Sequence, residues 1–176
     1  MSLLSWRPAD RRDRARLQIF TCTVPPLPYR PPRPRHPRQW ELDVQQFIRG
    51  LRPPASPDEM LLIGEDAAGI AAVSLSWVPP NDPSVVKLLT IAIADRCRGK
   101  GGEYADEALQ ITLDTIAERV SENDLESFLA FGLIDRRNQA SKRMCERAGL
   151  VHIGDDPSGY EEWAILVDLP AARRSS

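Results

Sequence analysis

Residues 85–102 of the sequence read VVKLLTIAIADRCRGKGG. The first part of this stretch is rich in β-branched and other apolar residues, which is typical of a β-strand. Its last seven positions hold three basic residues and three glycines, and a pattern of apolar residues at helical spacing follows from Ala105 to Val120. Glycines let backbone N–H groups turn towards an anion, and the start of a helix attracts negative charge. The stretch therefore predicts a strand, a phosphate-binding loop and a helix.

This loop does not match either of the common nucleotide-binding motifs. No Gly-x-x-x-x-Gly-Lys-Ser/Thr or Gly-x-Gly-x-x-Gly spacing is present. A short basic turn without a ligand is the alternative interpretation of the loop alone.

The rest of the chain alternates between strand and helix patterns. We expect strands at residues 6–8, 60–64, 70–77, 85–94, 128–134, 151–153 and 160–167. We expect helices at residues 10–20, 40–51, 105–120 and 138–148, with Asp10 capping the first. The resulting order, β-α-α-β-β-β-α-β-α-β-β, predicts an α/β fold with a mixed sheet.

Length and composition agree with one globular domain that needs no disulfide or metal. The chain has 176 residues, of which 42% are hydrophobic and 27% charged. The apolar runs are too short to span a membrane, and residues 1–8 do not resemble a secretory signal, so we expect a cytoplasmic protein with no membrane contact. Three scattered cysteines and two histidines argue against a metal site or a disulfide framework.

Charge is distributed unevenly along the chain. Residues 1–38 hold nine Arg and two Asp, and seven of the sixteen prolines lie between Pro25 and Pro37. The remaining residues hold 14 basic and 23 acidic side chains. A basic arm can bind nucleic acid, but the acidic remainder and a pI near 5.8 argue against that partner. The simpler interpretation is that this basic, proline-rich segment is a solvent-exposed linker.

Two motifs resemble those of the GNAT superfamily of acyl-CoA N-acyltransferases. The first is the strand ending at Ile93 followed by Arg96-x-x-Gly99-x-Gly101, which is similar to the family's acyl-CoA-binding loop. The second is NQASKRMCERAGL at residues 138–150, which is similar to the family's second signature. Residues 6–9 also resemble the usual first strand. The resemblance extends over nearly the whole chain.

This resemblance implies the GNAT fold, with a mixed, mostly antiparallel twisted sheet flanked by helices. It implies one N-acetyltransferase domain over residues 1–170 and a short polar tail over residues 171–176. The Pro/Arg-rich residues 25–38 become a stiff loop between the first two helices, near the mouth of the substrate site. The implied reaction transfers an acetyl group from acetyl-CoA to a primary amine of a small molecule or protein, by direct attack in a ternary complex. A homodimer is an open alternative for the assembly.

The resemblance also assigns residues to the cosubstrate. Backbone N–H groups around Ile91 and Ile93 are expected to contact the thioester carbonyl, in an opening between the fourth and fifth strands. Asn138 and Ser141 are expected beside the pantetheine arm, although Asn138 has a simpler role as a helix cap. The loop expected to hold the pyrophosphate comprises Arg96, Arg98, Gly99, Lys100, Gly101 and Gly102. Basic residues that could reach the 3′-phosphate are Arg136, Arg137, Lys142, Arg143 and Arg147.

The sequence departs from the family pattern in two ways. If the loop motif is instead started at Arg98, Glu103 takes a position that is normally small. Cys145 stands where many members have a Tyr that protonates the leaving thiolate, so Cys145 is a weak candidate for the general acid, beside Ser141 and water.

No general base is indicated, because residues 85–94 contain no carboxylate. The candidate carboxylates elsewhere are Glu41, Asp135, Glu161 and Glu162. Tyr160 and Trp163 are expected to pack in the core or at an edge. The acidic residues of the helix after the loop are expected to form a solvated face, and they are Glu103, Asp106, Glu107, Asp114 and Glu118. The missing Tyr and base leave a second hypothesis, a catalytically impaired GNAT-fold module that binds CoA or a partner.

Overall fold

The computed structural model describes residues 2–23 and 38–170. The predicted loop at residues 25–38 lies outside this part except for Arg38, and so does the predicted tail at residues 171–176. The strands are β1 (Ser5–Pro8), β2 (Glu59–Asp66), β3 (Gly69–Trp77), β4 (Val85–Ile93), β5 (Ser127–Asp135), β6 (Val151–Asp155) and β7 (Tyr160–Asp168). The helices are α1 (Arg14–Gln18), α2 (Gln39–Gly50), α3 (Glu103–Ser121) and α4 (Gln139–Arg147), with 3-10 turns η1 (Arg11–Asp13) and η2 (Asp95–Cys97).

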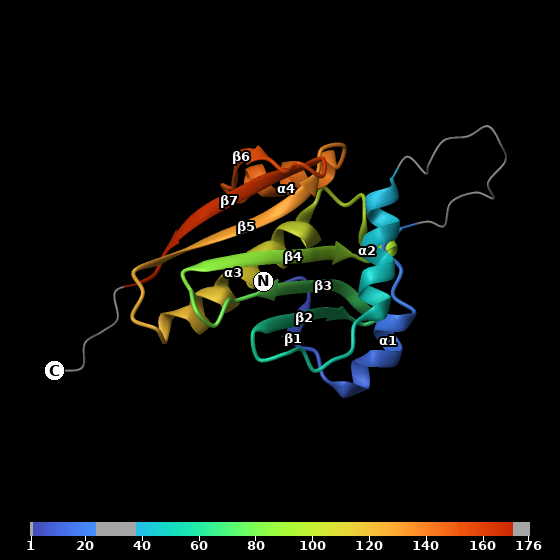
Figure 1. Ribbon diagram of the computed structural model, residues 1–176. Helices are drawn as coiled ribbons and strands as arrows, with labels where there is room; N and C mark the ends of the chain where they lie inside the picture. The colour runs from blue at the N-terminus through green and yellow to red at the C-terminus, as the bar shows by residue number, and fades with distance from the viewer. Residues whose placement is uncertain (1, 24–37, 171–176) are drawn as a thin grey trace.

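The seven strands form one sheet in the order β1-β2-β3-β4-β5-β7-β6. All neighbouring strands are antiparallel except β4 and β5, which are joined through α3 and run parallel. In Figure 1, α3 lies behind the sheet and α2 stands across the strand ends. The predicted order of strands and helices and the mixed, mostly antiparallel sheet are confirmed.

The core of the described residues has two parts, and β4 contributes residues to both. The first buries Leu17, Ile48 and Val73, and so joins α1 and α2 to β3 and its neighbours. The second buries Ile116, Phe128 and other apolar residues, and joins α3 and α4 to β4, β5 and β7. Trp163 belongs to this second part, as expected. The helical spacing of apolar residues seen in the sequence corresponds to these buried faces.

The first helix is shorter than predicted. Asp10 accepts a hydrogen bond from the Arg12 N–H and forms a capping box with Asp13, so the predicted cap is confirmed. The turn η1 and the helix α1 then end at Gln18. The chain leaves the helix there because Phe20 and Cys22 turn into the core, where both are buried.

Glu107 contradicts the prediction of a solvated face on α3. Its Oε1 accepts hydrogen bonds from the Leu4 N–H at 3.0 Å and the Trp6 Nε1–H at 2.8 Å, and also from the Ser2 hydroxyl. Its Oε2 accepts from the Leu3 N–H at 2.6 Å. Burial alone would raise the pKa of Glu107, but these donors outweigh it and hold the pKa below its usual range. The carboxylate therefore fastens the first strand to α3.

We expect Glu107→Gln to lower the free energy of unfolding by about 1–3 kcal/mol. The amide would place an NH₂ group against N–H and O–H donors whose hydrogen bonds the carboxylate accepts. Urea unfolding of the variant measures this loss. Asp114→Asn is a matched control, since Asp114 is exposed and accepts only from Gln110 on the same helix. A loss no larger than that of the control would contradict the role of Glu107.

Candidate functional site

Strands β4 and β5 separate part of the way along their length. They pair only from Val85 with Leu129 to Leu88 with Gly132, whereas β4 continues to Ile93 and β5 to Asp135. A β-bulge lies at this point, because Leu75 and Ser76 of β3 pair with Thr90 and Leu88 and leave Leu89 without a partner. In Figure 1 the two strands diverge towards the end of β4. The sheet therefore contains a fork between β4 and β5.

The fork exposes backbone N–H groups of β4. The Ala94 N–H donates to the Ala71 carbonyl of β3 at 2.8 Å. Because N–H groups alternate in direction along a strand, those of Ile91 and Ile93 face the opposite side, towards β5. Beyond Leu88 no strand pairs with β4 on that side in the described chain. Two parallel donors are thus available to an oxygen inside the fork.

The glycine-rich loop after β4 adopts the conformation that its composition predicts. Gly99, Gly101 and Gly102 have φ of +75°, +69° and +92°, in the region that favours glycine. Within residues 2–23 and 38–170, the backbone N–H groups of residues 99–102 donate no hydrogen bond. Gly102 is also the N-cap of α3 and brings no capping side chain. The loop and the start of α3 therefore offer donors to an anion.

A pocket of about 640 Å³ connects the loop with the fork. Its walls come from α2, the end of β4, the loop, the start of α3 and the first turns of α4. A smaller pocket of about 180 Å³ extends between β4 and β5. The residues that line both pockets are Trp40, Val44, Ile91, Asn138, Ser141 and Met144.

The predicted cosubstrate residues largely gather at the larger pocket. Of the ten, all except Arg96 and Gly101 line it. Asn138 caps α4, since its Oδ1 accepts from the Ser141 N–H at 3.2 Å and its Nδ2 donates to the Ser141 hydroxyl at 2.8 Å. The capping role and the place in the wall thus coexist.

Arg96 does not fit the predicted phosphate role. Its Nη2 donates to Asp66 Oδ1 at 2.8 Å and to the carbonyls of Gly69 and Ile70, at the turn between β2 and β3. The hydrogen bonds from Arg96 hold the pKa of Asp66 below its usual range. Arg98 and Lys100 are the loop cations that line the pocket. Glu103 is exposed in the first turn of α3 and does not line it, so it does not crowd the loop.

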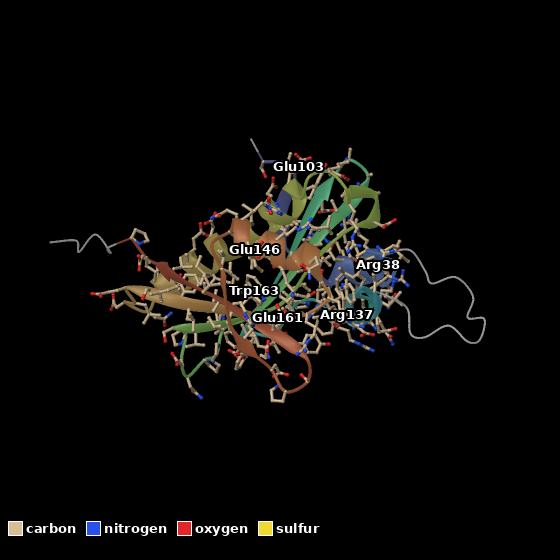
Figure 2. All side chains as sticks on the ribbon, turned by 90° about the horizontal axis from the view of Figure 1, so that it is seen from above. Arg38, Glu103, Arg137, Glu146, Glu161 and Trp163 are labelled. Atoms are coloured by element: carbon tan, nitrogen blue, oxygen red, sulfur yellow. The ribbon has the colours of Figure 1, made fainter. Side chains whose placement is uncertain are left out.

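Further positive charge surrounds the pocket. Arg38, Arg137 and Arg147 line it together with the loop cations, and Figure 2 shows Arg38 and Arg137 on the same side of the molecule. Arg147 is paired with Asp106 at 2.6 Å. The pocket's only acidic lining residue is Glu41, among the residues that the structure describes. An anionic ligand is therefore favoured.

Cys145 does not fit the role of a proton donor. Its side chain is buried in the second core and borders only the smaller pocket. Burial raises the pKa of the Cys145 thiol to about 11. A proton would have to move uphill to a leaving thiolate, whose own pKa is about 8.5.

Three of the four candidate bases already accept hydrogen bonds from other side chains. Asp135 accepts hydrogen bonds from Arg137, which lower its pKa, and Lys142 does the same to Glu161. Glu41 is bonded by Arg98 and Thr23. Glu162 lines neither of the two connected pockets.

Trp40 of α2 is a pocket residue that is missing from the predicted site. It lines both pockets, and the Arg137 guanidinium carbon lies 5.1 Å from the centre of its ring. Its Nε1 is buried without a hydrogen-bond partner in the described chain. The local sequence carries no signal for this, because Arg137 lies almost a hundred residues away along the chain, just before α4.

In the described residues, no group of three or more His, Cys, Asp or Glu side chains is arranged to hold a metal ion. No helix of that part combines the length and apolar character needed to cross a bilayer.

Several solved structures are similar to the chain in fold, at low sequence identity. The chain is similar to AAC(6')-Ib in complex with ribostamycin and coenzyme A, at 12% identity over 99% of this chain and 98% of that one, with a TM-score of 0.64. It is similar to a mutant of SpeG spermidine N-acetyltransferase from Vibrio cholerae, at 17% identity over 94% and 95%, with a TM-score of 0.63. A GNAT-family acetyltransferase from Streptococcus pneumoniae matches at 15% identity over 93% and 99%, with a TM-score of 0.57. No protein-family model and no curated protein sequence matches the chain. The chain therefore has the predicted GNAT fold.

Proposed function

We propose that this chain, which has the GNAT fold, is an acetyl-CoA-dependent N-acyltransferase that acetylates a primary amine. The observation that carries the proposal is the continuous pocket from the glycine-rich loop to the fork of β4 and β5. The N–H groups of the loop, together with Arg98 and Lys100, can bind the pyrophosphate of CoA. The pocket walls around Ile91 and Asn138 can hold the extended pantetheine arm, whose end would lie in the fork. The residues of this chain therefore supply the contacts that CoA needs.

In the proposed reaction the amine nitrogen attacks the thioester carbonyl carbon directly. The N–H groups of Ile91 and Ile93 stabilise the charge that develops on the carbonyl oxygen. The C–S bond then breaks, the thiolate leaves with the electron pair, and the nitrogen loses its extra proton to solvent. Because an alkylamine has a pKa of about 10, it must lose one proton before it attacks.

The departing thiolate needs no protein acid in this proposal. A thiol with a pKa of about 8.5 is a good leaving group near neutral pH. We therefore expect Cys145→Ala to keep kcat within about threefold, whereas loss of a general acid costs roughly 100-fold or more. Steady-state kinetics with acetyl-CoA measure this. A 100-fold loss of kcat in a variant that unfolds at the wild-type urea concentration would show that Cys145 does donate the proton.

A catalytically impaired CoA-binding module is the second candidate. The buried Cys145 in the usual Tyr position and the ion pairs on Asp135 and Glu161 favour it. Release of CoA thiol from acetyl-CoA, followed over a panel of primary amines, separates the two. Turnover with any amine excludes the impaired module, whereas saturable binding without turnover supports it.

Four expectations from the sequence stay predictions. They are the amine acceptor, a cytoplasmic location, the single domain over residues 1–170 and the placement of the Pro/Arg-rich loop at the mouth of the substrate site. Deletion of residues 25–37 tests the loop, since an unchanged KM for the acceptor would argue against a place at the mouth.

A further inference from the structure

The loop and helix α2 are joined by one ion pair inside the pocket. Arg98 Nη1 donates to Glu41 Oε1 at 2.8 Å. Only 10% of the Glu41 side chain is exposed, and 35% of the Arg98 side chain. The other oxygen of Glu41 accepts from the Thr23 hydroxyl at 2.7 Å and lies 3.4 Å from Arg38 Nη1. The carboxylate is thus fixed on α2, and its partner belongs to the segment that would hold phosphate.

We propose that Glu41 is a positioning residue that holds Arg98 in the ligand-free protein and releases it to the CoA pyrophosphate. The inference rests on the proposed function, because it takes CoA as the ligand of the larger pocket. It assigns Glu41 a role other than that of a base.

The chemistry of the two anions decides the exchange. A pyrophosphate in the loop brings two negative groups next to Gly99, Lys100 and Gly102, which line the same pocket as Glu41. A guanidinium pairs with phosphate oxygens at least as well as with a carboxylate. Arg98 must leave Glu41 to point its donors at the phosphates, so part of the binding free energy is used to break the ion pair.

The exchange also changes the charge around Glu41. Once Arg98 has moved, Glu41 keeps Thr23 and Arg38 but loses its closest cation. Its negative charge then becomes available to a cationic amine that enters beside α2. Since linkage is reciprocal, CoA and a cationic amine should each raise the affinity for the other.

A second ion pair of the same kind supplies a matched control. Arg96 lies two positions before Arg98 and pairs with Asp66, but Arg96 does not line the pocket. Like Glu41→Gln, Asp66→Asn removes one negative charge and releases one arginine. It does so at a place where the proposed ligand does not bind.

The test is calorimetric titration of the full chain with CoA and with pantetheine, which lacks the pyrophosphate. We expect Glu41→Gln to tighten CoA binding about threefold to fivefold, the upper part of the range for a single ion pair that is partly exposed. Its affinity for pantetheine should stay at the wild-type value. Asp66→Asn should leave both affinities unchanged. In an Arg98→Gln background, adding Glu41→Gln should have less than about a twofold effect.

The outcomes separate the inference from the proposed function. CoA binding by wild type with equal or weaker binding by a folded Glu41→Gln variant overturns the inference and leaves the proposed function standing. Tightening that persists in the Arg98→Gln background also overturns it, because the effect would then be general charge repulsion. Absence of CoA binding by wild type overturns the proposed function and the inference with it.

Discussion

The double variant Arg98→Glu/Lys100→Glu is expected to lose at least about 100-fold in affinity for CoA. Both side chains line the pocket at the loop that offers N–H groups to an anion. The variant removes two cations from the pyrophosphate site and adds two anions, and each charge-assisted hydrogen bond contributes about 1.5–3 kcal/mol. Isothermal titration with CoA measures the loss.

The control for this variant changes net charge by the same amount elsewhere. Arg11→Glu/Arg14→Glu alters two exposed arginines of η1 and α1. We expect it to bind CoA within about twofold of wild type at physiological salt, where charges farther apart than roughly 8 Å are screened. Equal losses in the two double variants would mean that overall charge, not the loop, governs binding.

Asp13→Asn is expected to destabilise the fold by about 3 kcal/mol, because it breaks a buried ionic network. Asp13 is 1% exposed and accepts hydrogen bonds from Arg7 at 2.8 Å through both oxygens. It also accepts from Arg16 at 3.0 Å and from the Asp10 N–H at 2.8 Å. Arg7 and Arg16 pair in addition with Glu65 of β2. Urea unfolding at neutral pH measures the loss.

This network also predicts a pH dependence. The hydrogen bonds from Arg7 outweigh burial and lower the pKa of Asp13 from 3.8 to about 2. A carboxyl whose pKa is lower in the folded state stabilises the protein above its unfolded pKa, and this stabilisation is lost as the pH falls towards the folded pKa. The stability difference between wild type and Asp13→Asn should therefore be full at pH 6 and shrink between about pH 4 and pH 2. A difference that does not change with pH would contradict the ionic origin.

The same network changes the interpretation of the basic first segment. Three of its nine arginines, Arg7, Arg12 and Arg16, are paired with Asp10, Asp13 or Glu65. The charge that resembled an arm for nucleic acid is thus used in part to hold β1, α1 and β2 together.

The fold could be predicted from the sequence because its signals are local. The β-branched run from Val85 and the helical spacing from Ala105 lie within single elements, and the observed bounds differ by only a few residues. The first helix was overestimated because Ile19 and Phe20 continue an apolar pattern although the chain already turns there. Tertiary packing of Phe20 and Cys22 decided that boundary.

The site could be predicted only in part, for the same reason. Glycines at positive φ and a loop before a helix are local features, and the sequence placed them correctly. The partners of the charged side chains are not local: Arg96 pairs with Asp66, Arg98 with Glu41, and Glu107 with residues at the start of the chain. Such pairings depend on which elements become neighbours in the sheet, and a one-dimensional pattern does not specify them.

Isothermal titration of the full chain with acetyl-CoA tests the central claim most directly, because the proposed reaction and the exchange at Arg98 both require a CoA ligand in the larger pocket. We predict saturable binding of one acetyl-CoA per chain in the micromolar range, typical of enzyme substrates, and its loss in Arg98→Glu/Lys100→Glu. No binding by wild type at high micromolar acetyl-CoA would contradict the account.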